Sequence, residues 1–296
     1  MGTRYSVWMR RLLRPIVSLL ILDIGLSFVP IPDWWEAGVF NDYLYSTRVR
    51  KLIFSSKEHN SLGYRDSEWT TENRKIAFLG DSRTYGLFVH KEHTYAEQVE
   101  RLSSWESMNL GVPGATTFEA LDSMLPDALH YKPEVSVVCL DLNSSLISFV
   151  PRGNSSRRSD IMGNLIRSSS IWMFLEGGWH SLFSERVPVI SLQDYGQQLD
   201  QIFQTLIENG VSRNILLVGW TPLQNYPNLY TQDLYDQYRE KSREVARERS
   251  IPIIEFTDEL QGIPLEEAYL GEHQIHLSEV SHKKIAESII RVLDES

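Results

Sequence analysis

The chain has 296 residues, of which 42% are hydrophobic and 23% are charged, so it is long and apolar enough to fold around a sizeable core. Its formal net charge of −10 argues against a surface that binds nucleic acid, because phosphate binding needs clustered Lys and Arg. The single cysteine, Cys139, excludes an internal disulfide bond.

Residues 1–32 have the pattern of a membrane-targeting segment. Arginines precede an apolar run from Ile16 to about Ile31, and acidic residues follow it. We therefore predict an uncleaved signal-anchor and a membrane-anchored, extracytoplasmic domain, either periplasmic or on the cell surface. Because the run is short for a membrane span and contains Asp23, a cleaved signal peptide and a soluble helix packed on the domain stay open.

Residues 33–72 show no clear period, and we predict that they form a lead-in packed on the domain at 73–296. In that domain, strand-like and helix-like segments alternate, which is typical of an α/β fold with a parallel sheet. The predicted strands are Lys75–Leu79, Ser107–Gly111, Val135–Leu142, Ile215–Trp220 and Pro252–Phe256. The predicted helices lie at Tyr95–Leu102, after Thr116, around Leu199–Ile207, at Leu234–Glu248 and at Glu279–Leu293.

This order predicts a three-layer αβα sandwich with a five-stranded, flavodoxin-like parallel sheet. Two of the helices begin with capping boxes, Thr94-x-x-Glu97 and Thr116-x-x-Glu119. A stretch rich in Ser, Arg and Gly at about 149–190 interrupts the alternation, and we interpret it as an insertion or lid near the site.

Each of the first three predicted strands is followed by a residue that could take part in catalysis. The first strand runs into Gly80-Asp81-Ser82, which delivers a serine hydroxyl to the carboxyl edge of the sheet, where active sites of such folds lie. Ser82 alone could also be an ordinary turn or capping residue. Gly114, after the second strand, and Asn143, after the third, are turn residues that could also donate hydrogen bonds to an oxyanion together with the Ser82 N–H.

Near the C-terminus, His276 lies in a loop that should return to the same edge of the sheet. It could accept the Ser82 proton and later give it to a leaving group. His273 and His276 could alternatively form a metal pair, but no third ligand is evident in the sequence, so no metal site is predicted.

The four blocks that contain Ser82, Gly114, Asn143 and His276 resemble the SGNH, or GDSL-type, hydrolase superfamily, whose Ser, Gly, Asn and His occur in this order. The resemblance extends from about residue 60 to the end and includes Asn60–Asp66, which is similar to extracytoplasmic bacterial members. It implies a serine nucleophile, a histidine base, a three-donor oxyanion hole and no cofactor.

The chain departs from the family pattern at the residue that orients the base. The usual Asp-x-x-His is His273-Gln274-Ile275-His276 here, so the acid is replaced by a histidine. A backbone carbonyl could orient His276 instead, Glu272 could take the place of the acid, or the protein could be a weak enzyme or a pseudoenzyme.

The function implied by the resemblance is a serine esterase that removes an acyl group from a carbohydrate or a lipid. In this superfamily the acyl group is often acetyl. A polysaccharide O-acyltransferase would use the same acyl-serine. The alternative outside the enzymes is a non-catalytic carbohydrate-binding protein, which could assist a membrane acyltransferase.

Overall fold

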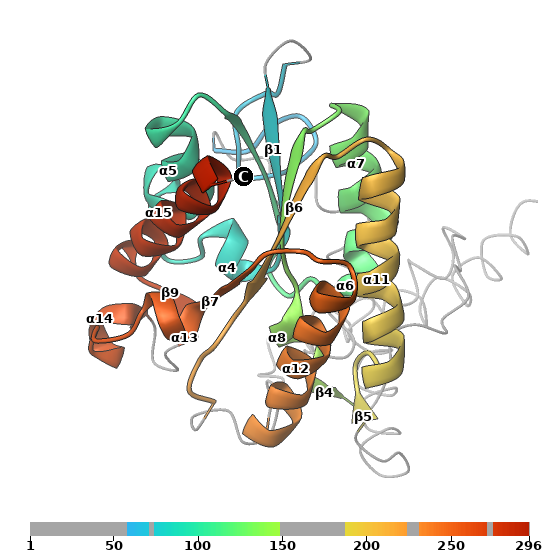
Figure 1. Ribbon diagram of the computed structural model, residues 1–296. Helices are drawn as coiled ribbons and strands as arrows, with labels where there is room; N and C mark the ends of the chain where they lie inside the picture. The colour runs from blue at the N-terminus through green and yellow to red at the C-terminus, as the bar shows by residue number, and fades with distance from the viewer. Residues whose placement is uncertain (1–57, 71–73, 149–186, 224–230, 271–274, 296) are drawn as a thin grey trace, which may run out of the picture.

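The structure of the protein is a computed structural model, which describes residues 58–70, 74–148, 187–223, 231–270 and 275–295 (Figure 1). The predicted signal-anchor, the lead-in up to residue 57 and residues 149–186 of the predicted insertion lie outside this range. Among the residues that the structure describes, no helix is long and apolar enough to span a membrane.

Five parallel strands form the central sheet, which confirms the predicted fold class. In chain order they are β1 (Lys75–Gly80), β2 (Glu106–Gly111), β3 (Val135–Cys139), β6 (Arg213–Val218) and β7 (Ile253–Glu255). Their spatial order is β2-β1-β3-β6-β7, so β1 lies between β2 and β3. The chain therefore reverses direction across the sheet beside β1, and the residues that follow β1 lie at the switch point where such sheets bind ligands.

Helices cover both faces of the sheet (Figure 1). One face carries α5 (Tyr95–Leu102) and α15 (Glu279–Glu295), and the other carries α7 (Leu125–His130), α11 (Leu192–Glu208) and α12 (Gln232–Glu248). Alternate residues of β1 belong to the two cores: Ile76 and Phe78 pack on the α5 side, and Ala77 and Leu79 on the other. This alternation follows from the two-residue repeat of a strand and buries β1 on both faces.

Short elements complete the described part of the chain. The helical turns are α4 (Ser82–Tyr85), η1 (Lys91–His93), α6 (Thr117–Glu119), η2 (Ala120–Met124), α8 (Asp141–Ser144), α13 (Phe256–Glu259) and α14 (Leu265–Ala268). Two small antiparallel pairs join β4 (Ile147–Ser148) to β5 (Val187–Pro188), and β8 (Tyr269–Leu270) to β9 (His276–Leu277). The helix predicted after Thr116 is present, with η2 as a π-helical turn between α6 and α7.

Three strands end earlier than the sequence predicts. β3 stops at Cys139 because the chain turns into α8, and β7 stops before Phe256, which begins α13. β6 stops at Val218 because the backbone of Gly219 bonds to side chains instead of a neighbouring strand: its N–H donates to Asp141 Oδ2 (2.8 Å) and its C=O accepts from Arg239 Nε (2.7 Å).

Glycines allow α4 to pack closely on the sheet. A Cβ atom on Gly111 would lie 2.2 Å from the backbone nitrogen of Tyr85, and one on Gly80 would lie 1.8 Å from Thr84 Oγ1. Both positions therefore require glycine if the residues after Ser82 are to lie against β1 and β2.

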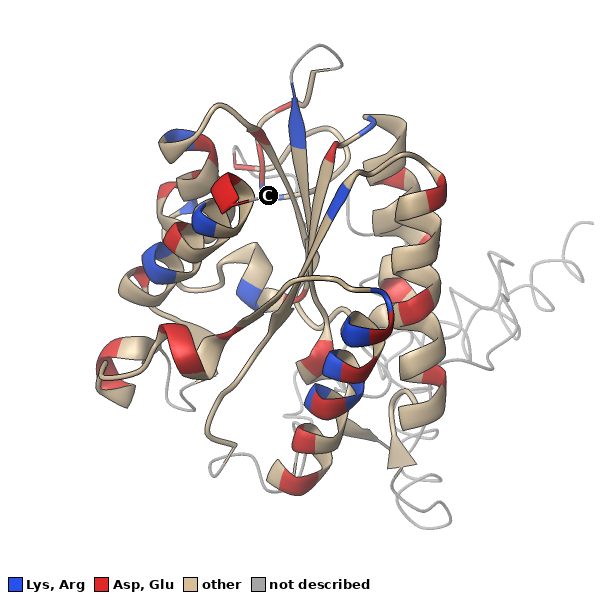
Figure 2. Ribbon diagram, in the orientation of Figure 1, with Lys and Arg blue, Asp and Glu red and all other residues tan. Residues whose placement is uncertain are grey.

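Charged residues lie mainly on the outer helices, and the sheet is largely free of them (Figure 2). On α12, basic residues are interspersed with acidic ones, and Arg243 and Arg247 both pair with Glu240. Such mixed surfaces promote solubility and give no single-sign field.

Candidate active site

Ser82 begins α4 immediately after β1. The preceding residue, Asp81, is the helix N-cap, and its carboxylate accepts a hydrogen bond of 2.9 Å from the Arg83 N–H. Ser82 is 7% exposed. As the first residue of a helical turn, it has a backbone N–H with no acceptor within the turn. The sequence Gly-Asp-Ser thus places a hydroxyl and an available N–H together at the carboxyl end of β1.

The two strands beside β1 bring the predicted oxyanion donors to the same edge. Gly80 pairs with Gly111 on one side and with Cys139 on the other, so β1, β2 and β3 end at the same level. Gly114 follows β2 with a φ of 76°, a left-handed conformation that favours glycine. Asn143 lies in α8, directly after β3, and is 9% exposed. The sheet order thereby places all three predicted donors at one edge.

His276 reaches this edge from the C-terminal part of the chain. It is the first residue of β9, which pairs with β8 and lies against α4. Its ring meets that of Phe88 edge-on, with centroids 4.9 Å apart. Burial, and secondarily the charge of Arg83, lowers the pKa of His276 to about 4. The imidazole is therefore neutral at pH 7, as a proton acceptor must be.

The predicted orienting residues, Glu272 and His273, lie outside the described residues, and so does half of the alternative His273–His276 metal pair. Within the described ranges, no cluster of three or more His, Cys, Asp or Glu side chains could hold a metal ion.

A buried arginine directly follows the nucleophile position. Arg83 is fully buried and forms a bidentate ion pair with Asp81, with Nε–Oδ1 and Nη2–Oδ2 distances of 3.1 and 2.7 Å. Its Nη2 also lies 2.5 Å from Asp141 Oδ1. Burial alone would lower the pKa of Arg83, but the charges of Asp81 and Asp141 outweigh it and raise that pKa well above its usual value. Arg83 is therefore a permanent cation between two carboxylates.

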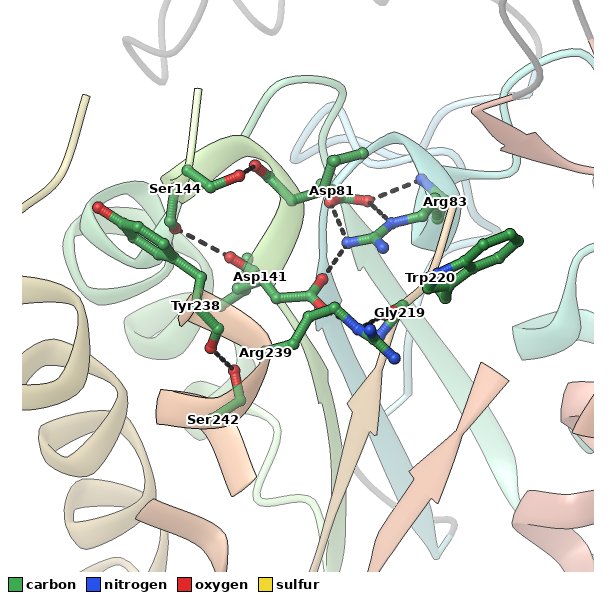
Figure 3. A network of polar contacts seen from close by, with 12 residues as sticks. Asp81, Arg83, Asp141, Ser144, Gly219, Trp220, Tyr238, Arg239 and Ser242 are labelled. Atoms are coloured by element: carbon green, nitrogen blue, oxygen red, sulfur yellow. Dashed lines mark hydrogen bonds and ion pairs between the residues drawn. The ribbon is translucent and has the colours of Figure 1, made fainter. Parts of the chain in front are cut away.

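This ion cluster, defined as Asp81, Arg83 and Asp141, extends to the fourth strand (Figure 3). Asp141 accepts the Gly219 N–H, and Tyr235 of α12 accepts a hydrogen bond of 3.1 Å from Arg83 Nη1. A Cβ atom on Gly219 would lie 1.8 Å from the same Nη1. The cluster thus joins the carboxyl ends of β1, β3 and β6 to α12.

Sequence reasoning missed both Arg83 and Phe88. A charge within a turn motif is usually solvated, and the partner Asp141 is distant in sequence, so the pairing could not be predicted. Phe88 gives no sequence signal, because a lone aromatic residue in a loop is compatible with many roles.

Comparison with known proteins shows the family of the chain. Residues 78–284, more than half of the chain, match the model of the GDSL-like Lipase/Acylhydrolase family. The chain belongs to the GDSL-like lipase/acylhydrolase family. The name GDSL stands for Gly-Asp-Ser-Leu. This chain has Gly80-Asp81-Ser82 followed by Arg83 in the place of the leucine. No curated protein sequence matches the chain.

Several solved structures share the fold. A lipase/acylhydrolase from Enterococcus faecalis is 17% identical, with a TM-score of 0.52 over 74% of this chain and 95% of the other. The acetyl xylan esterase AlAXEase is 14% identical, with a TM-score of 0.50 over 74% and 98%. The esterase EstA from Pseudoalteromonas sp. is 12% identical, with a TM-score of 0.50 over 75% and 100%. At these identities the similarity shows the fold.

Substitution of Arg83 tests whether the ion cluster holds the site together. Arg83→Leu would leave two buried carboxylates without their cation, so we expect the free energy of unfolding to fall by about 3–5 kcal/mol. Urea denaturation of the purified domain measures it. Arg247→Leu is the control, because Arg247 forms an exposed ion pair with Glu240 whose loss should cost less than about 1 kcal/mol. Equal costs for the two substitutions would contradict the structural role of the cluster.

Proposed function

We propose that the protein is a serine esterase that removes an acyl group from an O-acylated carbohydrate. The acyl group that we propose is acetyl. One observation carries the proposal: in a chain of the GDSL-like family, Ser82 follows β1 between the ends of β2 and β3, and the strand that carries His276 lies against α4. The similarity in fold to an acetyl xylan esterase supports the acetyl group and the carbohydrate.

The proposed reaction has two steps. A His276 ring nitrogen takes the Ser82 proton while Ser82 Oγ attacks the ester carbon, and the carbonyl oxygen becomes an oxyanion held by Ser82 N–H, Gly114 N–H and the Asn143 side chain. The ester C–O bond then breaks, and the protonated His276 gives its proton to the leaving alcohol. Water, activated by His276, hydrolyses the acyl-serine and restores the free Ser82 hydroxyl.

The ion cluster has two consequences for this reaction. It fixes α4 relative to β3, so that Ser82 and Asn143 keep their spacing during the attack. The charge of Arg83 also disfavours the protonated form of His276. His276 still needs a group that orients its ring, and we propose that Glu272 or a backbone carbonyl supplies it.

The proposed location rests on the sequence pattern alone. The arginines and the apolar run of residues 1–32 support a membrane anchor and an extracytoplasmic domain. A carbohydrate hydroxyl in place of water would make the same acyl-serine an O-acyltransferase intermediate, and product analysis with a sugar acceptor separates the two reactions.

Replacement of Ser82 tests the nucleophile. We expect the domain from about residue 33 onward to hydrolyse p-nitrophenyl acetate, and Ser82→Ala to lower kcat by at least about 10⁴-fold, because no covalent intermediate can form. Ser212→Ala is the control, since Ser212 lies before β6 at the opposite edge of the sheet.

The outcomes separate the enzyme from a binding protein. Activity that survives in Ser82→Ala would contradict the assignment of the nucleophile. A folded wild-type protein that hydrolyses neither p-nitrophenyl acetate nor acetylated xylan would contradict the esterase. His273→Asp then shows whether the missing acid is the reason.

The pH dependence of kcat/KM tests the environment of His276. Only the neutral imidazole accepts the Ser82 proton, so activity falls as the pH drops through the pKa of His276, which lies at about 4. We therefore expect kcat/KM to stay constant from pH 7 to about pH 5 and to be halved near pH 4. Acetate release measures it, and an acidic limb near the ordinary histidine value of about 6.5 would contradict the burial of His276.

A further inference from the structure

Phe88 has an unusual conformation next to the candidate base. Its φ is 71°, in the left-handed region that a bulky residue rarely adopts, and its side chain is 66% exposed. A single exposed apolar residue is common on a protein surface. Phe88 differs because its backbone is strained and because its ring contacts His276. Such strain persists only where the surroundings enforce it, and it clusters at functional sites.

The surroundings of Phe88 do enforce this conformation. Gly86 N–H and Leu87 N–H both donate to the carbonyl of Ser82, at 3.1 Å each, so the loop is bonded to the nucleophile residue itself. On the other side, Arg65 donates from Nη1 to the carbonyl of Gly86 (2.7 Å) and from Nη2 to that of Val89 (3.0 Å). The backbone on both sides of Phe88 is therefore fixed, while its side chain is exposed.

We propose that Phe88 is a specificity-determining residue that binds the alcohol portion of the ester. This inference rests on the proposed function, in which His276 gives its proton to the leaving alcohol oxygen. That oxygen must lie within hydrogen-bond distance of the imidazole, at about 3 Å. The ring packed against the imidazole then lies beside the alcohol and not beside the acyl chain.

The chemistry of Phe88 indicates the class of alcohol. Phenylalanine has no hydrogen-bonding group, so it offers a flat apolar face and no directional contact. One face of a pyranose ring presents C–H groups, which pack on an aromatic face and bury apolar area. A largely exposed aromatic ring on a fixed backbone suits a sugar residue of a longer chain, whereas a lipid acyl tail would need an enclosed apolar slot. Phe88 is thus the binding surface for the acetylated sugar ring.

Two substrate series test the side of the ester that Phe88 contacts. The first keeps the acetyl group and varies the alcohol, from ethyl acetate to acetylated xylo-oligosaccharide. The second keeps p-nitrophenol and varies the acyl chain from acetyl to octanoyl. We expect Phe88→Ala to lower kcat/KM for the acetylated sugar about tenfold relative to ethyl acetate, because only the sugar buries area on the ring. The acyl-chain preference should be unchanged.

Two control variants separate this role from a structural one. Phe88→Gly removes the strain at a φ of 71°, so we expect an unchanged or higher Tm together with the same loss of sugar preference. Leu102→Ala removes an exposed apolar side chain of α5 and should change neither property. An equal loss on all esters, or a change confined to acyl-chain preference, would overturn the proposal.

A binding measurement separates this inference from the proposed function. Calorimetric titration of acetylated xylo-oligosaccharide into Ser82→Ala protein, with and without Phe88→Ala, needs no turnover. We expect Phe88→Ala to weaken binding about tenfold. Equal affinity, or no binding to either protein, would overturn the role of Phe88. Loss of Ser82-dependent hydrolysis with the binding difference retained would overturn only the esterase.

Discussion

The arrangement of the candidate site depends on one buried ion cluster. Arg83 lies between Asp81 and Asp141 with no access to solvent, and Asp141 also holds the backbone of Gly219. A buried ion pair contributes little net stability compared with apolar residues of similar size, but the loss of one partner is costly. The cluster therefore acts mainly as a geometric constraint. It requires the ends of three strands to meet at one place, and Ser82 lies next to that place.

The same constraint influences the chemistry. Arg83 is the residue after the candidate nucleophile, and its charge acts on His276 in the same direction as burial does. A base with a low pKa is available over a wide pH range, but it accepts a proton less readily than one tuned near neutral pH. The group that orients His276 is therefore important, and His273 stands where the family usually has an acid in that role.

The sequence predicts the fold well because the fold depends on local patterns. β1 alternates between two apolar cores, and the capping threonines Thr94 and Thr116 begin helices where the sequence indicates them. The predicted site residues follow adjacent strands, so a correct sheet order is enough to bring them to one edge. The ion cluster could not be predicted in this way, because the pairing of Arg83 with Asp141 depends on contacts distant in sequence. The early end of β6 has the same cause, since Asp141 and Arg239 take up the backbone bonds of Gly219. The strained φ of Phe88 also results from distant contacts, those of Arg65.

The central claim is that Ser82 becomes acylated, and direct detection of the acyl-enzyme tests it most simply. The protein is mixed with p-nitrophenyl acetate, quenched in acid within the first turnovers, digested and analysed by mass spectrometry. Our account predicts one acetyl group on the peptide that contains Ser82, which disappears on longer incubation as water hydrolyses the ester. An acetyl group on a different residue, or none on a protein that releases p-nitrophenol, would contradict it.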